Sequence, residues 1–270
     1  LVANQTFPRS IDGPALSPTG DIYLANVERT GTVGVLEPGQ TSAKVLFEIP
    51  EGGAAAGMRL DGQGTLWMTD HRKHRIYKYE PRNKNLELYL EAPQMNQPND
   101  IALARDGSLF LSDPSWHSKK PGHIWRITPD KQIHLVRTNV RAANGLDLSP
   151  DESTLYYSES ITGGLYAIDL RNQDQTPRQI HRFARDTVDG IRTDATGVIY
   201  VTRIREGTVD LISPEGQLLS RVKLSGKEPT NIGFGGPDGR DVAVTLRDAG
   251  NIEMFRSAQP GRDFLLRTGR

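Results

Sequence analysis

Short runs of alternating apolar and polar residues fill the chain, and turn dipeptides rich in Gly and Pro separate them. Alternation with a period of two is typical of β-strands that bury one face. One unit recurs: a polar or small residue, usually a Gly, a short apolar run, a turn and a second apolar strand. Its copies begin at Asp12, Ala56, Asn99, Asn144, Asp189 and Asn231, with spacings of 44, 43, 45, 45 and 42 residues. A period of this length is typical of the blades of a β-propeller.

The second half of each unit also repeats, as in GTVGVLEPG (31–39) and GHIWRITPD (122–130), and segments such as LELYLEA supply a fourth strand. The pattern therefore predicts an all-β fold, a six-bladed β-propeller of four-stranded antiparallel blades in one domain over 1–270. An open ring would expose pairing edges on its first and last blades. We therefore expect the N-terminal segment, residues 1–10, to pair with the C-terminal segment, where Asp263 and the following Phe-Leu-Leu end the sixth unit.

Composition narrows the classes of partner. Hydrophobic residues make up 36%, mean hydropathy is −0.51, and no apolar stretch approaches the roughly 20 residues that cross a bilayer, so we expect a soluble protein. The 33 basic residues balance 33 acidic ones, which predicts neither a nucleic-acid nor a membrane partner. Without Cys, disulfides, thiolate metal sites and a cysteine nucleophile are excluded. The chain begins at Leu1, and the pattern leaves open a cytoplasmic, periplasmic or secreted location and the oligomeric state.

The six repeat positions carry two carboxylates, three amides and one methyl group. In a propeller the innermost strands begin near the axis, so these side chains surround one small volume. Buried carboxylates without a partner repel each other and lose hydration, and a divalent cation would satisfy them. A hard, all-oxygen set favours Ca²⁺, with Mg²⁺, Mn²⁺ and Zn²⁺ as alternatives. The competing interpretation is that Asp12-Gly13, Asn144-Gly145 and Asp189-Gly190 are ordinary turn dipeptides.

Four segments, 97–114, 143–160, 188–202 and 228–245, resemble the gluconolactonase and senescence-marker-protein (regucalcin) family of six-bladed propellers, which is similar in fold to diisopropyl fluorophosphatase. The resemblance implies metal-dependent hydrolysis of sugar lactones and related esters. It also implies that a Glu, two Asn and an Asp hold the ion. The amides correspond to Asn99 and Asn144, the Asp to Asp189, and the Glu to Asp12.

The sequence departs from the family pattern at three places. Asp12-Gly13-Pro14 replaces Glu-Gly-Pro with a side chain shorter by one methylene. Gln97 stands where some members carry an Arg that contacts substrate. Residues 113–117, Asp-Pro-Ser-Trp-His, replace Asp-Pro-Pro-Tyr-Gly. The expected substrate is therefore a small-molecule lactone or ester in general.

The expected catalytic group is Asp189, acting as ligand and as the base that activates water for attack on the ring carbonyl. Direct attack by Asp189 is the alternative, and it suits phosphotriester or phosphorus–fluoride substrates. The residues expected to contact substrate are Gln97, Asp100, His71, Trp116 and His117. A propeller without catalytic activity, binding a partner through its loops, is the rival outside enzymology.

Overall fold

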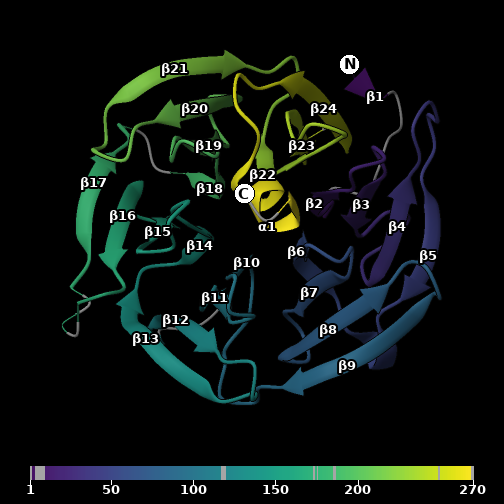
Figure 1. Cartoon of the computed structure of the whole chain (residues 1–270), viewed down its shortest axis with the longest axis horizontal. Coiled ribbons are helices and arrows are strands. Elements are labelled where there is room, and N and C mark those ends of the chain that lie inside the picture. The colour runs from purple at the N-terminus through teal and green to yellow at the C-terminus, as the bar shows by residue number, and fades with distance from the viewer. Residues whose placement is uncertain are drawn as a thin grey trace.

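The computed structural model describes residues 2–3, 10–116, 120–172, 174, 176–184, 187–248 and 250–268. Six four-stranded sheets surround a common centre (Figure 1). Five have their first strand innermost and their last at the rim, whereas the sixth has β22 innermost and β1 at the rim. Neighbouring strands within every sheet run antiparallel. The predicted six-bladed propeller is confirmed. Among the described residues, no helix has the length and apolar character that a membrane span requires.

The blades follow one another along the chain. Blade 1 contains β2 (Asp12–Leu16), β3 (Ile22–Ala25), β4 (Thr32–Leu36) and β5 (Lys44–Glu48), and the 3-10 turn η1 (Pro50–Gly52) follows it. Blade 2 contains β6 (Ala55–Leu60), β7 (Leu66–Asp70), β8 (Arg75–Glu80) and β9 (Asn85–Glu91). Blade 3 contains β10 (Ile101–Leu103), β11 (Leu109–Asp113), β12 (Gly122–Ile127) and β13 (Ile133–Val140). Blade 4 contains β14 (Ala143–Leu148), β15 (Thr154–Glu159), β16 (Gly164–Asp169) and β17 (Arg178–Arg182). Blade 5 contains β18 (Val188–Thr193), β19 (Ile199–Arg203), β20 (Thr208–Ile212) and β21 (Leu218–Lys223). Blade 6 contains β22 (Pro229–Gly235), β23 (Asp241–Leu246), β24 (Asn251–Arg256) and β1 (Val2–Ala3).

Hydrophobic cores lie between adjacent blades, and each of the six junctions has its own cluster of buried side chains. At the junction of blades 5 and 6, for example, Tyr200 packs edge-to-face on Phe234 with ring centroids 4.9 Å apart. Burial of apolar surface at every junction holds each blade against both neighbours. The innermost strands, which carry the candidate site, are therefore fixed from both sides.

The ring closes as expected, because Val2 and Ala3 of β1 pair with Glu253 and Ile252 of β24. The C-terminal partner is β24, the last strand of the sixth unit before Asp263. Asp263 belongs to the helix α1 (Arg262–Thr268), which lies over the centre of the ring in Figure 1. Buried Arg262 fixes α1 there, since its guanidinium donates to the carbonyl of Leu103 at 2.7 Å.

Candidate active site

A cavity of about 350 Å³ opens at one end of the propeller axis, and we call it the hub cavity. Its described lining residues are Ser10, Ile11, Asp12, Asn99, Trp116, Asn144, Ser160, Asp189, Ile204, Thr230 and Arg247. The four side chains expected to bind a cation, Asp12, Asn99, Asn144 and Asp189, therefore share one cavity. We call these four the hub tetrad. They come from blades 1, 3, 4 and 5.

The pairing register shows which repeat positions are equivalent. Each innermost strand except β10 has a bulge near its start, as where Ala143 pairs with Glu159 but Leu146 with Tyr157. By this register Asn144 and Asp189 occupy equivalent positions, whereas Asp12 lies one residue earlier and the repeat position at Asn231 one residue later. Sequence alignment of the repeats missed these one-residue shifts.

Gly13 makes the shift in blade 1 possible. Its φ is 55°, in the left-handed region, and a Cβ there would lie 2.1 Å from the carbonyl oxygen of Ala56. Only glycine meets both requirements at low cost. The backbone can therefore turn directly after Asp12, and the Asp12 carboxylate reaches the hub cavity from this earlier position.

Hydroxyl groups on the second strands fix the backbone of the site. Thr69 of β7 donates to the carbonyl of Asn99 at 2.5 Å, and Ser158 of β15 donates to the carbonyl of Asp189 at 2.7 Å. Thr202 of β19 donates in the same way to Thr230 at 2.9 Å. Each bond links one blade to the next beside the hub cavity. These main-chain carbonyls are thereby satisfied within the protein.

A chain of hydrogen bonds orients the two amides. The Nδ2 of Asn99 donates to the Oδ1 of Asn144 at 2.7 Å, and the Nδ2 of Asn144 donates to the Ser160 hydroxyl at 2.8 Å. The Ser160 hydroxyl donates in turn to the carbonyl of Val188 at 2.7 Å. The chain connects blades 3, 4 and 5 and restricts the rotation of both amides. The amide oxygens keep acceptor capacity, because each carries two lone pairs.

The two carboxylates of the hub tetrad are costly to ionise. Burial raises the pKa of Asp12 to about 6, although the backbone N–H of Gly13, the side chain of Asn231 and the charge of Arg247 lower it. Burial also raises the pKa of Asp189 well above its usual value, and the charge of Asp12 raises it further. Both residues are partly exposed and line the cavity. Among the described residues, neither carboxylate forms an ion pair within 4.0 Å.

This donor set fits a hard divalent cation. Two carboxylates and two amide oxygens offer only oxygen ligands, with a formal charge of about −2, and they lie around one cavity. Within the described part of the chain, no group of three His, Cys, Asp or Glu side chains gathers to hold a metal. Any cation at the hub would therefore depend on the amides of Asn99 and Asn144 as well as on the carboxylates.

Of the described residues expected to contact substrate, Trp116 lines the hub cavity, whereas Gln97, His71 and Asp100 do not. Trp116 lines the hub cavity, with 42% of its surface exposed. Gln97 does not line it; its Oε1 accepts a hydrogen bond from the backbone N–H of Trp116 at 2.9 Å, so it positions Trp116. His71 also lies outside the lining, and burial lowers its pKa. His117 lies outside the described residues.

Asp100 corrects the sequence expectation most clearly, because its side chain lies beneath the hub cavity in a group of ion pairs. Its carboxylate accepts hydrogen bonds from Arg192 at 2.9 Å and Arg59 at 3.4 Å, and it is 1% exposed. Below it, Arg262 of α1 pairs with Asp147 at 3.4 Å. We call these five residues the lower cluster. Asp100 is thus held inside the propeller, out of reach of a substrate in the hub cavity.

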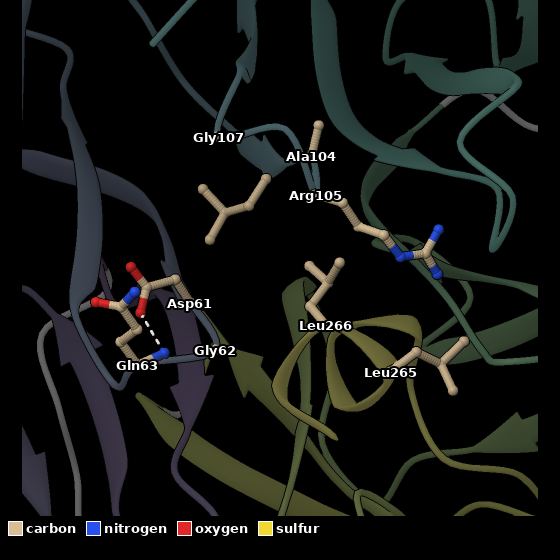
Figure 2. Close-up of a pocket in the computed structure, with 9 residues that line it drawn as sticks. Asp61, Gly62, Gln63, Ala104, Arg105, Gly107, Leu265 and Leu266 are labelled. Atoms are coloured by element: carbon tan, nitrogen blue, oxygen red, sulfur yellow. Dashed lines mark hydrogen bonds between the residues drawn. The ribbon is translucent and has the colours of Figure 1, made fainter. Parts of the chain in front are cut away.

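A larger cavity, of about 720 Å³, lies at the other end of the blades, beside α1 (Figure 2). Leu103 and Leu266 supply apolar surface there, and Asp61 and Arg105 supply charge. Leu103 ends β10, whereas Asn99 precedes it, so the two cavities lie at opposite ends of that strand. The lining residues drawn in Figure 2 do not converge on one point as the hub tetrad does.

Sequence reasoning missed six of the described lining residues: Ser10, Ile11, Thr230, Ser160, Ile204 and Arg247. The last three share one place in the repeat. Each directly follows the second strand of its blade, after β15, β19 and β23. His71 holds the same place after β7, and the loop that follows a second strand lies on the face where propeller loops carry function. Applying this reasoning to every blade would have found all three.

Comparison with known proteins places the chain in a family. The family described as the SMP-30/gluconolactonase/LRE-like region matches residues 30–247. The chain belongs to this family. A 6-deoxy-6-sulfogluconolactonase of Pseudomonas putida is 30% identical over 234 residues, covering 83% of this chain and 78% of that protein. A gluconolactonase of Zymomonas mobilis is 22% identical over 205 residues, covering 66% of this chain but only 57% of that protein's length.

Solved structures support the fold of this family member. The crystal structure of regucalcin from Agrobacterium tumefaciens, described as a calcium-binding protein, matches with a TM-score of 0.80 and 19% identity. The match covers 97% of this chain and 94% of that one. At this identity the similarity concerns the propeller architecture, and the chemistry of the hub cavity depends on the residues described above.

Proposed function

We propose that the protein hydrolyses a lactone, a sugar lactone or a related cyclic ester, in the hub cavity, with a divalent cation held by the hub tetrad. One observation carries the proposal: two partly buried carboxylates and two oriented amides line one cavity, and no described residue neutralises the carboxylates by an ion pair. The names of the relatives, gluconolactonase and 6-deoxy-6-sulfogluconolactonase, support a lactone as substrate.

The cation that suits this tetrad best is Ca²⁺, because all four donors are oxygens. When bound, such an ion supplies Lewis-acid polarisation of the substrate carbonyl. Asp12, Asn99, Asn144 and Asp189 hold it from four different blades. The bonds to Ser160 and between the amides keep Asn99 and Asn144 in place before the ion arrives. Little reorganisation is then needed on binding.

Asp189 acts as the general base. It lies on β18, where the hydroxyl of Ser158 fixes its main-chain carbonyl, and it lines the hub cavity. From there it takes the proton of the water that attacks the lactone carbonyl. Trp116 and Ile204 cover the sides of the cavity and remove bulk water from the ring. Removal of bulk water strengthens the electrostatic interactions inside the cavity.

Elemental analysis of the purified protein and a chelation experiment test the proposal. We expect hydrolysis of D-glucono-1,5-lactone to disappear after chelator treatment and dialysis, and to return with Ca²⁺ more than with Mg²⁺, Mn²⁺ or Zn²⁺. An aryl phosphotriester in the same assay tests direct attack by Asp189. Unchanged lactone hydrolysis in the metal-free protein would contradict the proposal. Absence of hydrolysis with every ion and substrate would favour a propeller that only binds.

A further inference from the structure

Arg247 is the one cationic side chain among the described residues that line the hub cavity. It directly follows β23, so it enters the cavity from blade 6, which contributes no member of the hub tetrad. Its side chain is 44% exposed and can meet a ligand that arrives from solvent. Electrostatically it is the opposite of the tetrad.

Glu228 binds the Nε and the backbone N–H of Arg247. The Nε of Arg247 donates to the Glu228 carboxylate at 3.1 Å, and the backbone N–H of Arg247 donates to the Glu228 carbonyl at 3.0 Å. No described residue accepts a hydrogen bond from the two terminal guanidinium nitrogens. A guanidinium held at Nε keeps terminal N–H donors for an oxyanion, and such charge-assisted bonds are about twice as strong as neutral ones.

The charge of Arg247 acts on the site itself. It lowers the pKa of both Asp12 and Asp189, so its field extends to the proposed cation site. A positive charge in the same cavity opposes the binding of a cation by the hub tetrad. The same charge favours a substrate that brings a negative group into the cavity. A neutral substrate would gain nothing from it.

The opposite wall of the cavity offers no charge. Trp116, at the end of blade 3, supplies aromatic surface, and Gln97 next to it is neutral and occupied with the Trp116 backbone. Blades 3 and 6 face each other across a ring of six, so the apolar and cationic walls lie on opposite sides. A ligand that spans the cavity thus meets an apolar surface at one end and a guanidinium at the other.

We propose that Arg247 binds an anionic substituent of the substrate, a carboxylate, phosphate or sulfonate, and so makes the hub cavity selective for anionic lactones. This inference rests on the lactonase activity proposed above. The lactone carbonyl faces the hub tetrad, and the substituent reaches the terminal nitrogens of Arg247. Arg247 acts on binding, because it takes no part in the attack of water.

The kinetic test compares D-glucono-1,5-lactone with its 6-phosphate in wild type and Arg247→Ala. For the phosphorylated lactone we expect KM to rise about tenfold or more, since a hydrogen bond to a charged group contributes roughly that factor. Any effect of the variant on the base or on the ion is common to both substrates, so in saturating Ca²⁺ the ratio of kcat/KM for the phosphorylated over the neutral lactone should fall about tenfold or more. Arg247→Lys should recover part of the loss. Equal loss on both lactones would overturn the inference.

A binding measurement separates this inference from the proposed activity. Calorimetry with 6-phosphogluconate and gluconate, the hydrolysis products, needs no turnover. Wild type should bind the phosphorylated acid more tightly than Arg247→Ala does, with gluconate little affected. Arg256→Ala is the matched control, because this exposed blade 6 arginine pairs with Asp238 and Asp241 away from the cavity. Wild type without lactonase activity but with Arg247-dependent binding would overturn only the proposed function; equal binding by Arg247→Ala would overturn this inference.

Discussion

The two ends of the propeller axis hold carboxylates in opposite electrostatic surroundings: Asp100 and Asp147 are buried, whereas Asp12 and Asp189 are partly exposed. In the lower cluster, Asp100 contacts Arg59 and Arg192, and Asp147 contacts Arg262, all within 3.4 Å. In the hub tetrad, the carboxylates have no such partner among the described residues. The ion pairs of the lower cluster connect blades 2 to 5 with α1. The unpaired carboxylates of the hub tetrad are available to a ligand.

The pKa shifts alone do not distinguish the two ends. Burial raises the pKa of Asp100 to about 7, although Arg59 lowers it, and burial likewise raises the pKa of Asp147. The pKa values of Asp12 and Asp189 move in the same direction for the same first cause. What separates a candidate catalytic carboxylate from a structural one here is its partner. Substitutions at the two ends should therefore have opposite effects on stability and activity.

The largest effect is expected from Asp189→Asn at the hub. The variant loses the base and one charge of the proposed cation site, so lactone hydrolysis in saturating Ca²⁺ should fall by about 10³-fold or more. The melting temperature of the metal-free variant should equal or exceed that of wild type, because a partly buried carboxylate with a raised pKa is removed. Steady-state kinetics measures the loss of activity, and thermal denaturation measures the melting temperature. Wild-type turnover would place the base elsewhere.

The matched change in the lower cluster, Asp100→Asn, should act on stability. Arg59 and Arg192 would lose their shared carboxylate while remaining buried, which costs about 3 to 5 kcal/mol when a buried pair is broken. Urea unfolding measures the loss. Lactonase activity per folded molecule should fall far less than in Asp189→Asn. A stability loss below about 1 kcal/mol would mean that water or rearrangement neutralises the two arginines.

These contrasts also indicate what the sequence could predict. The repeat spacing predicts six blades because every blade buries its apolar face against its neighbours with the same local pattern of residues. It also predicts that Asn99, Asn144 and Asp189 meet at the axis, as they do. Asp100 was misassigned because residue type does not reveal its partner, and Arg59 and Arg192 come from two other blades.

The repeat pattern also could not predict features that depend on single contacts, namely the bulge after Asp12 and the helix α1. Apolar alternation does not record a one-residue bulge, so Asp12 was aligned with Asn144 although the pairing register offsets it. The helix α1 spans seven residues, too few for a clear helical period, and Arg262 is held by contacts with Leu103 and Asp147 from distant blades. Tertiary contacts, rather than local preference, decide these places.

A pH series with and without Ca²⁺ tests the contribution of Asp12 at the hub. The pKa of Asp12 in the folded protein, about 6, exceeds the ordinary aspartate value of 3.8, so the folded protein binds more protons between these values and loses stability as pH rises through them. For metal-free protein this contribution is on the order of 2 to 3 kcal/mol by pH 7. Ca²⁺ should offset the loss, increasingly so at higher pH. Melting curves of wild type and Asp12→Asn from pH 5 to 7 test this; parallel curves would show that Asp12 titrates normally.

The smallest effect is expected from Asp12→Glu, which adds one methylene at the position that the register offsets by one residue. The hub cavity has about 350 Å³ of space for the longer side chain. If the Asp12 carboxylate falls short of the other three ligands, the added reach should tighten Ca²⁺ binding by about threefold to tenfold, or roughly 1 kcal/mol. Titration calorimetry measures the change. The control is Asp21→Glu, because Asp21 accepts a hydrogen bond from Thr19 in the turn after β2 and does not line the cavity. Weaker binding would show that the left-handed turn at Gly13 already brings the shorter carboxylate to the ion, so that the backbone, rather than side-chain length, completes the site in blade 1.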